Sequence, residues 1–236
     1  MGDLTSAILL AALAGAAIPL GAWLARFDRL LPGPIRHQAN HWIMAFGAGA
    51  LLSAVALVLI PEGTERLHGL VALLPFLMGA VIALSVDVIL SRNGGSKAQL
   101  LAMLMDFIPE TIALGAILTA DPKMALLLAA MIGAQNLPEG FNADRELADG
   151  SVSRAKRLAL FIALIPLGPI AALAGLSFFA DSPTILGGLM LFSAGGILYL
   201  IFQDIAPQVP IKHIWSPPLG AILGFVLGLA GHILTG

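Results

Sequence analysis

Long runs of apolar residues dominate the chain, and short clusters of charged and turn-forming residues separate them. An apolar run of about 20 residues is long enough to cross a membrane as an α-helix. The expected spans are Leu4–Ala25, His41–Pro61, Leu70–Leu90, Leu100–Ala120, Met124–Leu147, Leu158–Phe179, Thr184–Ala206 and Pro218–Leu234. We therefore expect an all-α polytopic membrane protein with eight transmembrane helices, in which residues 1–236 form a single transmembrane domain.

The expected connections contain prolines, glycines and aspartates, which favour turns. They include Pro32-Gly33-Pro34, Gly94-Gly95, Asp121-Pro122, Asp149-Gly150, Asp181-Ser182-Pro183 and residues 207–217. The fourth and fifth spans are joined only by the residues from Asp121 to Lys123. These two spans are therefore expected to form an antiparallel hairpin.

Basic residues are distributed unevenly over the connections. Those after the first, third, fifth and seventh spans hold Arg26, Arg29, Arg36, Arg92, Lys97, Arg145, Arg154, Lys156, Arg157 and Lys212, and the others hold only Arg66 and Lys123. Basic connections stay in the cytoplasm. The pattern predicts that both termini lie outside the cell and that the protein lies in the plasma (inner) membrane.

Composition supports a membrane protein and narrows the chemistry. Hydrophobic residues make up 58% of the chain and charged residues 11%, whereas a soluble domain has about 25% charged residues. The few scattered basic residues give no indication of nucleic-acid binding, so no nucleic-acid partner is expected, and the absence of cysteine excludes disulfides and thiolate metal sites. The first apolar run follows Asp3 and lacks a basic leader, so we expect a retained helix rather than a secretory signal.

The fourth and fifth expected spans carry near-copies of one polar motif. One reads Asp-Phe-Ile-Pro-Glu-Thr from residue 106, and the other reads Gln-Asn-Leu-Pro-Glu-Gly from residue 135. Residues four positions apart share a helix face. Asp106 is therefore expected beside Glu110, and Gln135 beside Glu139.

A proline precedes the glutamate in each motif and leaves one backbone carbonyl oxygen without its helical hydrogen bond. Pro109 and Pro138 lack an N–H, so the carbonyl groups of Met105 and Ala134 lose their helical donors. Acids inside a membrane are costly and mark a functional site by default. A polar packing network is the alternative, but such networks use mostly neutral groups, and three acids repel one another unless a cation joins them. The two half-sites therefore predict a cation site.

These paired motifs, the eight spans and the external termini resemble the ZIP (Zrt/Irt-like) family of divalent metal transporters, and its bacterial branch most closely. The second span reads Phe46-Gly47-Ala48-Gly49-Ala50-Leu51 and ends Leu59-Ile60-Pro61-Glu62-Gly63. The seventh reads Ser193-Ala194-Gly195-Gly196 and ends Gln203-Asp204-Ile205-Ala206-Pro207. Both segments are similar to the corresponding family helices.

The resemblance implies a set of metal ligands. The family's first metal position corresponds to Asp106, Glu110, Gln135 and Glu139. Its second position corresponds to Phe107, Asn136 and Gly168, with Glu110 and Glu139 as bridging ligands. Phe107 and Gly168 supply no side-chain ligand, so the second position is expected to be lost, although Asn136 stays a candidate metal ligand.

Several positions depart from the family pattern. Asp106-Phe107 replaces the usual His-Asn, and Gln135-Asn136 replaces His-Glu or Gln-Asp. The sixth span reads Gly168-Pro169-Ile170 instead of Glu-Pro-Ile, and Leu51 replaces a common methionine. The histidine-rich connection of the family is reduced to Ser91–Gln99, without histidine.

Other polar residues have two interpretations each. Asp204 is either a solvated helix end or, by its family position, an exit or auxiliary metal ligand. Glu62 is either an ordinary interfacial residue or an entrance ligand. Asn142 lies three residues beyond Glu139 and is expected to be a polar group at a helix end rather than a ligand.

The sequence thus predicts a transporter that imports a divalent metal cation, with zinc, manganese or iron as substrate. No enzymatic activity and no prosthetic group are expected. The expected partners are the lipid bilayer and the cation, and a homodimer stays open. A membrane metal sensor that does not transport is the alternative. An intramembrane protease fits poorly, because His-Glu-x-x-His is absent and Asp106 and Asp204 lack a Gly-x-Gly-Asp context.

Overall fold

The computed structural model describes residues 2–92, 98–148, 152–209, 211–212 and 214–235. Nearly all of these residues are helical, and no β-strand occurs among them. The α-helices are α1 (Asp3–Leu24), α2 (Gly33–Ala54), α3 (Ile60–Arg66), α4 (Leu73–Arg92), α5 (Ala98–Ile117), α6 (Pro122–Ala148), α7 (Arg154–Leu164), α8 (Leu167–Ala174), α9 (Pro183–Leu200) and α10 (Pro217–Thr235). The π-helical segments are η2 (Val55–Leu59), η4 (Gly175–Phe179) and η5 (Ile201–Ile205), and the 3-10 segments are η1 (Ala25–Leu30), η3 (Gly69–Ala72) and η6 (Ala206–Gln208).

Many of these elements continue into one another and form long apolar rods. Within the described residues, six rods are long and apolar enough to cross a membrane: Asp3–Asp28, Gly33–Arg66, Gly69–Ile89, Arg154–Phe179, Pro183–Gln208 and Pro217–Leu234. The chain is therefore an all-α membrane protein. The fourth and fifth expected spans correspond to α5 and α6, which are 20 and 27 residues long.

Two rods begin earlier than the sequence predicted. The second expected span began at His41, but α2 begins at Gly33, because Pro34 has the fixed backbone angle that suits the first turn of a helix. The sixth expected span began at Leu158, but α7 begins at Arg154. In both cases polar residues extend the helix beyond its apolar part.

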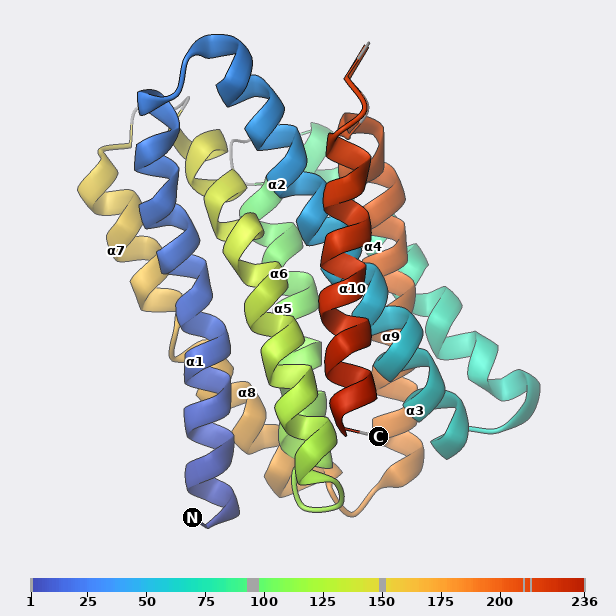
Figure 1. Ribbon diagram of the computed structural model, residues 1–236. Coiled ribbons are helices and arrows are strands. Elements are labelled where there is room, and N and C mark those ends of the chain that lie inside the picture. The colour runs from blue at the N-terminus through green and yellow to red at the C-terminus, as the bar shows by residue number, and fades with distance from the viewer. Residues whose placement is uncertain (1, 93–97, 149–151, 210, 213, 236) are drawn as a thin grey trace.

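The rods lie side by side in one bundle, and α1 begins at the end of the bundle where α10 finishes (Figure 1). The connection between α1 and α2 lies at the opposite end (Figure 1). α5 and α6 form the expected antiparallel hairpin, and the Asp121 carboxylate accepts a hydrogen bond of 2.9 Å from the Met124 N–H at the start of α6. α6 also packs against α1, α2 and α10, whereas α5 packs against α8 and α9.

Pairs of glycines bring the rods into backbone contact. A β-carbon on Gly49 of α2 would lie 1.9 Å from the Ala221 carbonyl oxygen of α10, and one on Gly224 of α10 would lie 2.0 Å from the Phe46 carbonyl oxygen of α2. Three other helix pairs have the same reciprocal contacts. They are α4 with α9 (Gly79 and Gly195), α1 with α6 (Gly21 and Gly140), and α5 with the α8–η4 rod (Gly115 and Gly175). Any larger residue would push these helices apart, so glycine fixes their close approach.

The α2–η2 and α9–η5 segments repeat one structural unit. Phe-Gly-Ala-Gly from residue 46 and Phe-Ser-Ala-Gly from residue 192 precede the π-helical segments at the same spacing, and a proline follows each segment. The glycine contact between Gly49 and Ala221 has its counterpart between Gly195 and Phe76. Because α2 and α9 run in opposite directions (Figure 1), the two units are inverted copies, an arrangement that many transporters use around a central site.

Candidate functional site

The two polar motifs meet in the interior, where α5 packs against α6. Glu110 and Gln135 are 0% exposed, and Asp106 and Glu139 are 4% exposed. The Gln135 Nε2 atom donates a hydrogen bond of 2.5 Å to Glu110 Oε2. The Asp106 and Glu139 carboxyl groups lie close enough to interact with each other. The four side chains that the sequence predicted to lie together therefore form one buried cluster.

The three carboxyl groups of this cluster interact with one another, and none of them forms an ion pair with a basic residue among the described residues. Glu110 interacts electrostatically with Asp106, and Glu139 interacts with both. Two carboxylates cannot form a hydrogen bond with each other, because neither has a donor. Buried charges are normally paired with opposite charge or bound to a metal. The cluster can therefore be neutralised either by protons or by a cation.

Several oxygens in the cluster have no hydrogen-bond partner among the described residues. They are Glu110 Oε1, Gln135 Oε1 and Glu139 Oε2. Most buried polar atoms in proteins have a partner, so each unpartnered acceptor needs an explanation. Carboxylate and amide oxygens are the ligands preferred by hard divalent cations. The donor set therefore fits such a cation.

The four side chains of the cluster are neighbours, but they do not surround a single point. Among the residues that the structure describes, no three histidine, aspartate or glutamate side chains converge closely enough to hold a metal ion. The amide nitrogen of Gln135 lies against Glu110. To ligate a cation, Gln135 must present its oxygen instead, and the carboxyl groups must close around the ion.

Asn136 and Phe107 contact α1 rather than the cluster. Asn136 Nδ2 donates a hydrogen bond of 3.0 Å to the Ala14 carbonyl oxygen, while its Oδ1 atom has no partner among the described residues. The Phe107 ring is fully buried, and its tip would lie 3.1 Å from a β-carbon on Gly15 and 3.0 Å from one on Gly168. The ring thus fills the space beside Gly168, where the family resemblance implied that ligands are lost.

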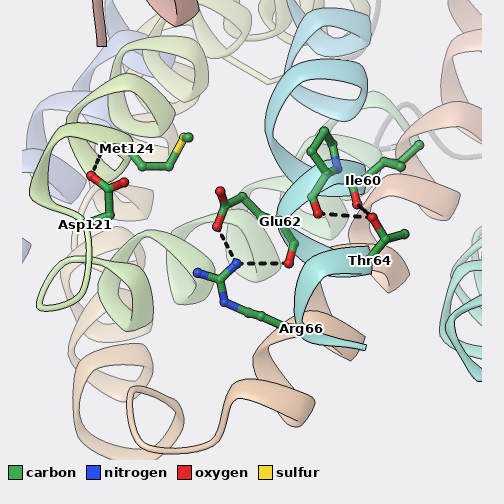
Figure 2. Close-up of polar contacts among 7 residues, drawn as sticks. Ile60, Glu62, Thr64, Arg66, Asp121 and Met124 are labelled. Atoms are coloured by element: carbon green, nitrogen blue, oxygen red, sulfur yellow. Dashed lines mark hydrogen bonds and ion pairs between the residues drawn. The ribbon is translucent and has the colours of Figure 1, made fainter. Parts of the chain in front are cut away.

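Polar residues outside the cluster include the candidates Asp204 and Glu62, and also Asp87. Asp204 lies in η5, but its side chain is outside the described residues, so its predicted role as an auxiliary ligand stays a prediction. Glu62 in α3 forms an ion pair with Arg66, which also donates a hydrogen bond of 2.9 Å to the Glu62 carbonyl oxygen (Figure 2). Asp87 in α4 accepts a hydrogen bond of 2.9 Å from the Tyr199 hydroxyl of α9.

A pocket extends from Glu139 toward one end of the bundle. It is small, with room for about one water molecule, partly open to the outside, and lies between α2, α6 and the η5–η6 segment. Its lining includes Glu139 at the buried end, Asn142 one turn further along α6, and the exposed residue Gln208. The sequence indicated only a polar helix end at Asn142. The spacing from Glu139 was the available signal, but the packing of α2 against α6 decides that Asn142 lines a pocket.

Comparisons with known proteins assign neither a family nor a function to the chain. No family model matches it, and a search of curated proteins finds no match. The case for function therefore depends on the residues of the site.

Adjacent residues on α6 allow a test of which side chains bind a cation. We expect Gln135→Leu to weaken Mn²⁺ binding severalfold, because it removes an amide oxygen and leaves Glu110 without its donor. Asn136→Leu should retain Mn²⁺ affinity but lower the unfolding temperature, because it removes a buried hydrogen bond to α1, worth about 1 kcal/mol. Calorimetric titration and thermal unfolding of both purified variants measure the two effects. The reverse pattern, with Mn²⁺ binding lost only in Asn136→Leu, would contradict the assignment.

Proposed function

We propose that this protein is a transporter that carries a divalent metal cation across the membrane through the α5–α6 site. The observation that carries the proposal is the buried cluster of three carboxyl groups and one amide, which has unpartnered oxygens and no basic partner within it. Carboxylates lower the cost of removing water from a cation, and they can exchange protons for metal as the ion enters and leaves. The resemblance of the paired motifs to those of the ZIP family supports the same function.

The proposed topology has eight spans, with α5 and α6 as the fourth and fifth. A helix of 20 residues is about 30 Å long, which matches the hydrocarbon core of a bilayer, so α5 and α6 are long enough to cross it. Eight crossings agree with chain ends that lie at one end of the bundle (Figure 1). Because the basic connections, including that between α1 and α2, stay in the cytoplasm, the termini are external and the membrane is the plasma (inner) membrane.

An alternating-access mechanism suits the two inverted units. The pocket beside Glu139 leads toward Gln208, near the end that carries most basic residues. In the other unit, the corresponding pocket would lead from Glu110 toward Glu62. It would be lined by the counterparts of Met44, Gly47, Asn142 and Ile205. These residues are Met190, Ser193, Ala113 and Leu59, and all are buried. The pocket at Glu139 thus supports access from the proposed cytoplasmic end, since the corresponding residues of the other unit are buried. Import is the direction that the ZIP resemblance implies.

The proposed site holds a single cation. Phe107 fills the space beside Gly168, and neither residue has a ligating atom in its side chain. No prosthetic group and no enzymatic activity are part of the proposal. A sensor that binds a cation without transporting it is the second candidate, because the loss of one of two metal positions could leave binding without movement.

Transport in reconstituted vesicles separates the two candidates. Wild-type protein should carry Mn²⁺ into the vesicles, and Glu139→Gln should abolish uptake, because it removes a charge that neutralises the buried cation. Glu65→Gln, which changes an exposed acid on α3, should leave uptake unchanged. Since the chain has no cysteine, an impermeant thiol reagent on Gly2→Cys reports the orientation of the protein. Saturable Mn²⁺ binding without uptake would establish the sensor, and uptake by Glu139→Gln would remove the site assignment.

The ligand set predicts a preference for hard cations. The expected ligands are all oxygens, whereas zinc favours nitrogen and sulfur ligands. Asp106→His should therefore raise the ratio of Zn²⁺ to Mn²⁺ uptake relative to wild type. Asp106→Asn controls for the lost charge and should reduce both rates without a comparable rise in the ratio. If Asp106→His leaves the ratio unchanged or lowers it, ligand type at this position does not set selectivity.

A further inference from the structure

We propose that the pocket between α2, α6 and the η5–η6 segment is a second cation position, where Glu139 and Asn142 bind the ion after it leaves the buried cluster. The inference rests on the proposed function, since it concerns the route of the same cation. Glu139 belongs to the cluster and also lines the pocket. The Glu139 side chain is therefore common to the cluster and the pocket. A cation can move from one to the other while it stays bound to this residue.

Two buried oxygens point to a ligand in this pocket. Glu139 is 96% buried, and neither its Oε2 atom nor the Asn142 Oδ1 atom has a hydrogen-bond partner among the described residues. The two residues lie three positions apart on α6, on one face of the helix. Both line the same pocket. Each of these two lining residues thus has one buried oxygen that lacks a hydrogen-bond donor among the described residues.

The chemistry of the pocket favours a partly hydrated divalent cation. A carboxylate and an amide oxygen are ligands suited to manganese, magnesium or ferrous iron, and the pocket has room for about one water molecule beside them. The described lining contains no lysine or arginine that would repel a cation. Exposed Gln208 lies in the lining, at the opening to the surface. The position therefore allows the ion to regain water before release.

The inverted repeat explains why this position belongs to one side only. The residue that corresponds to Asn142 in the α5 motif is Ala113, which is buried and has no polar side-chain atom. Glu110, the counterpart of Glu139, therefore has no amide oxygen three residues further along its helix. The second position is thus an asymmetric feature of the route toward Gln208.

A cysteine in the pocket gives a readout that does not depend on transport. Met44 lines the pocket without being one of the two proposed ligands. Met44→Cys should react with an impermeant thiol reagent, and Mn²⁺ should slow the reaction severalfold in a saturable way. The matched control is Met190→Cys at the corresponding position of the inverted unit, where the side chain is fully buried and should react slowly with or without Mn²⁺.

Substitutions of Asn142 in the Met44→Cys background test the ligand. Asn142→Leu should require a much higher Mn²⁺ concentration for protection, because it removes the amide oxygen. Asn142→Asp keeps an oxygen and adds charge, so protection should occur at a lower Mn²⁺ concentration than with Asn142. Equal protection in all three proteins, or no Mn²⁺ protection of Met44→Cys, would overturn the second position. If Asn142→Leu does not fold, the comparison of Asn142→Asp with Asn142 decides alone.

The outcome is distinguishable from failure of the proposed function. If vesicles carrying wild-type protein take up Mn²⁺ but Met44→Cys is not protected, transport stands and the second position is wrong. If Mn²⁺ protects Met44→Cys and protection depends on Asn142, but no uptake occurs, the second position stands as a cation site and transport is wrong.

Discussion

The burial of three carboxyl groups in an apolar bundle is the constraint on which the rest of this structure depends. Acidic groups at membrane depth are expensive, and the cost falls only where opposite charge, protons or hydrogen bonds compensate them. Here Gln135 donates a hydrogen bond to Glu110, and Asp106 lies close to Glu139. The reciprocal glycine contacts hold α1 against α6 and α5 against the α8–η4 rod, so the helices that carry the cluster are fixed by close backbone packing.

Much of the fold could be predicted from the sequence because membrane spans depend on composition over a long window. The apolar runs identified the rods, and the spacing of the motifs placed Asp106, Glu110, Gln135 and Glu139 in one cluster. The helix starts were less accurate, because a helix extends through polar residues once its first turn is formed, as α2 does from Gly33. The inverted units were not predicted from the sequence, because their equivalence depends on the glycine contacts between neighbouring helices.

The side-chain directions within the site could not be predicted from spacing alone. Gln135 and Asn136 are neighbours in the sequence, yet one bonds to the cluster and the other to α1. Helical geometry turns adjacent residues by roughly 100°, so the neighbouring helix decides which polar atom each one meets. The same reason explains Asn142, whose place in a pocket depends on how α2 and the η5–η6 segment pack against α6. Patterns within one helix contain no information about such contacts.

The central claim is that the two Pro-Glu motifs together form one cation site in the interior of the bundle. Anomalous diffraction at the manganese edge, from crystals of the full chain grown with Mn²⁺, tests it most directly. The account predicts an anomalous peak between α5 and α6, within bonding distance of Glu110 and Glu139, and no second peak beside Phe107 and Gly168. Two ions bridged by the glutamates, or an interior cluster without any ion at saturating Mn²⁺, would contradict it.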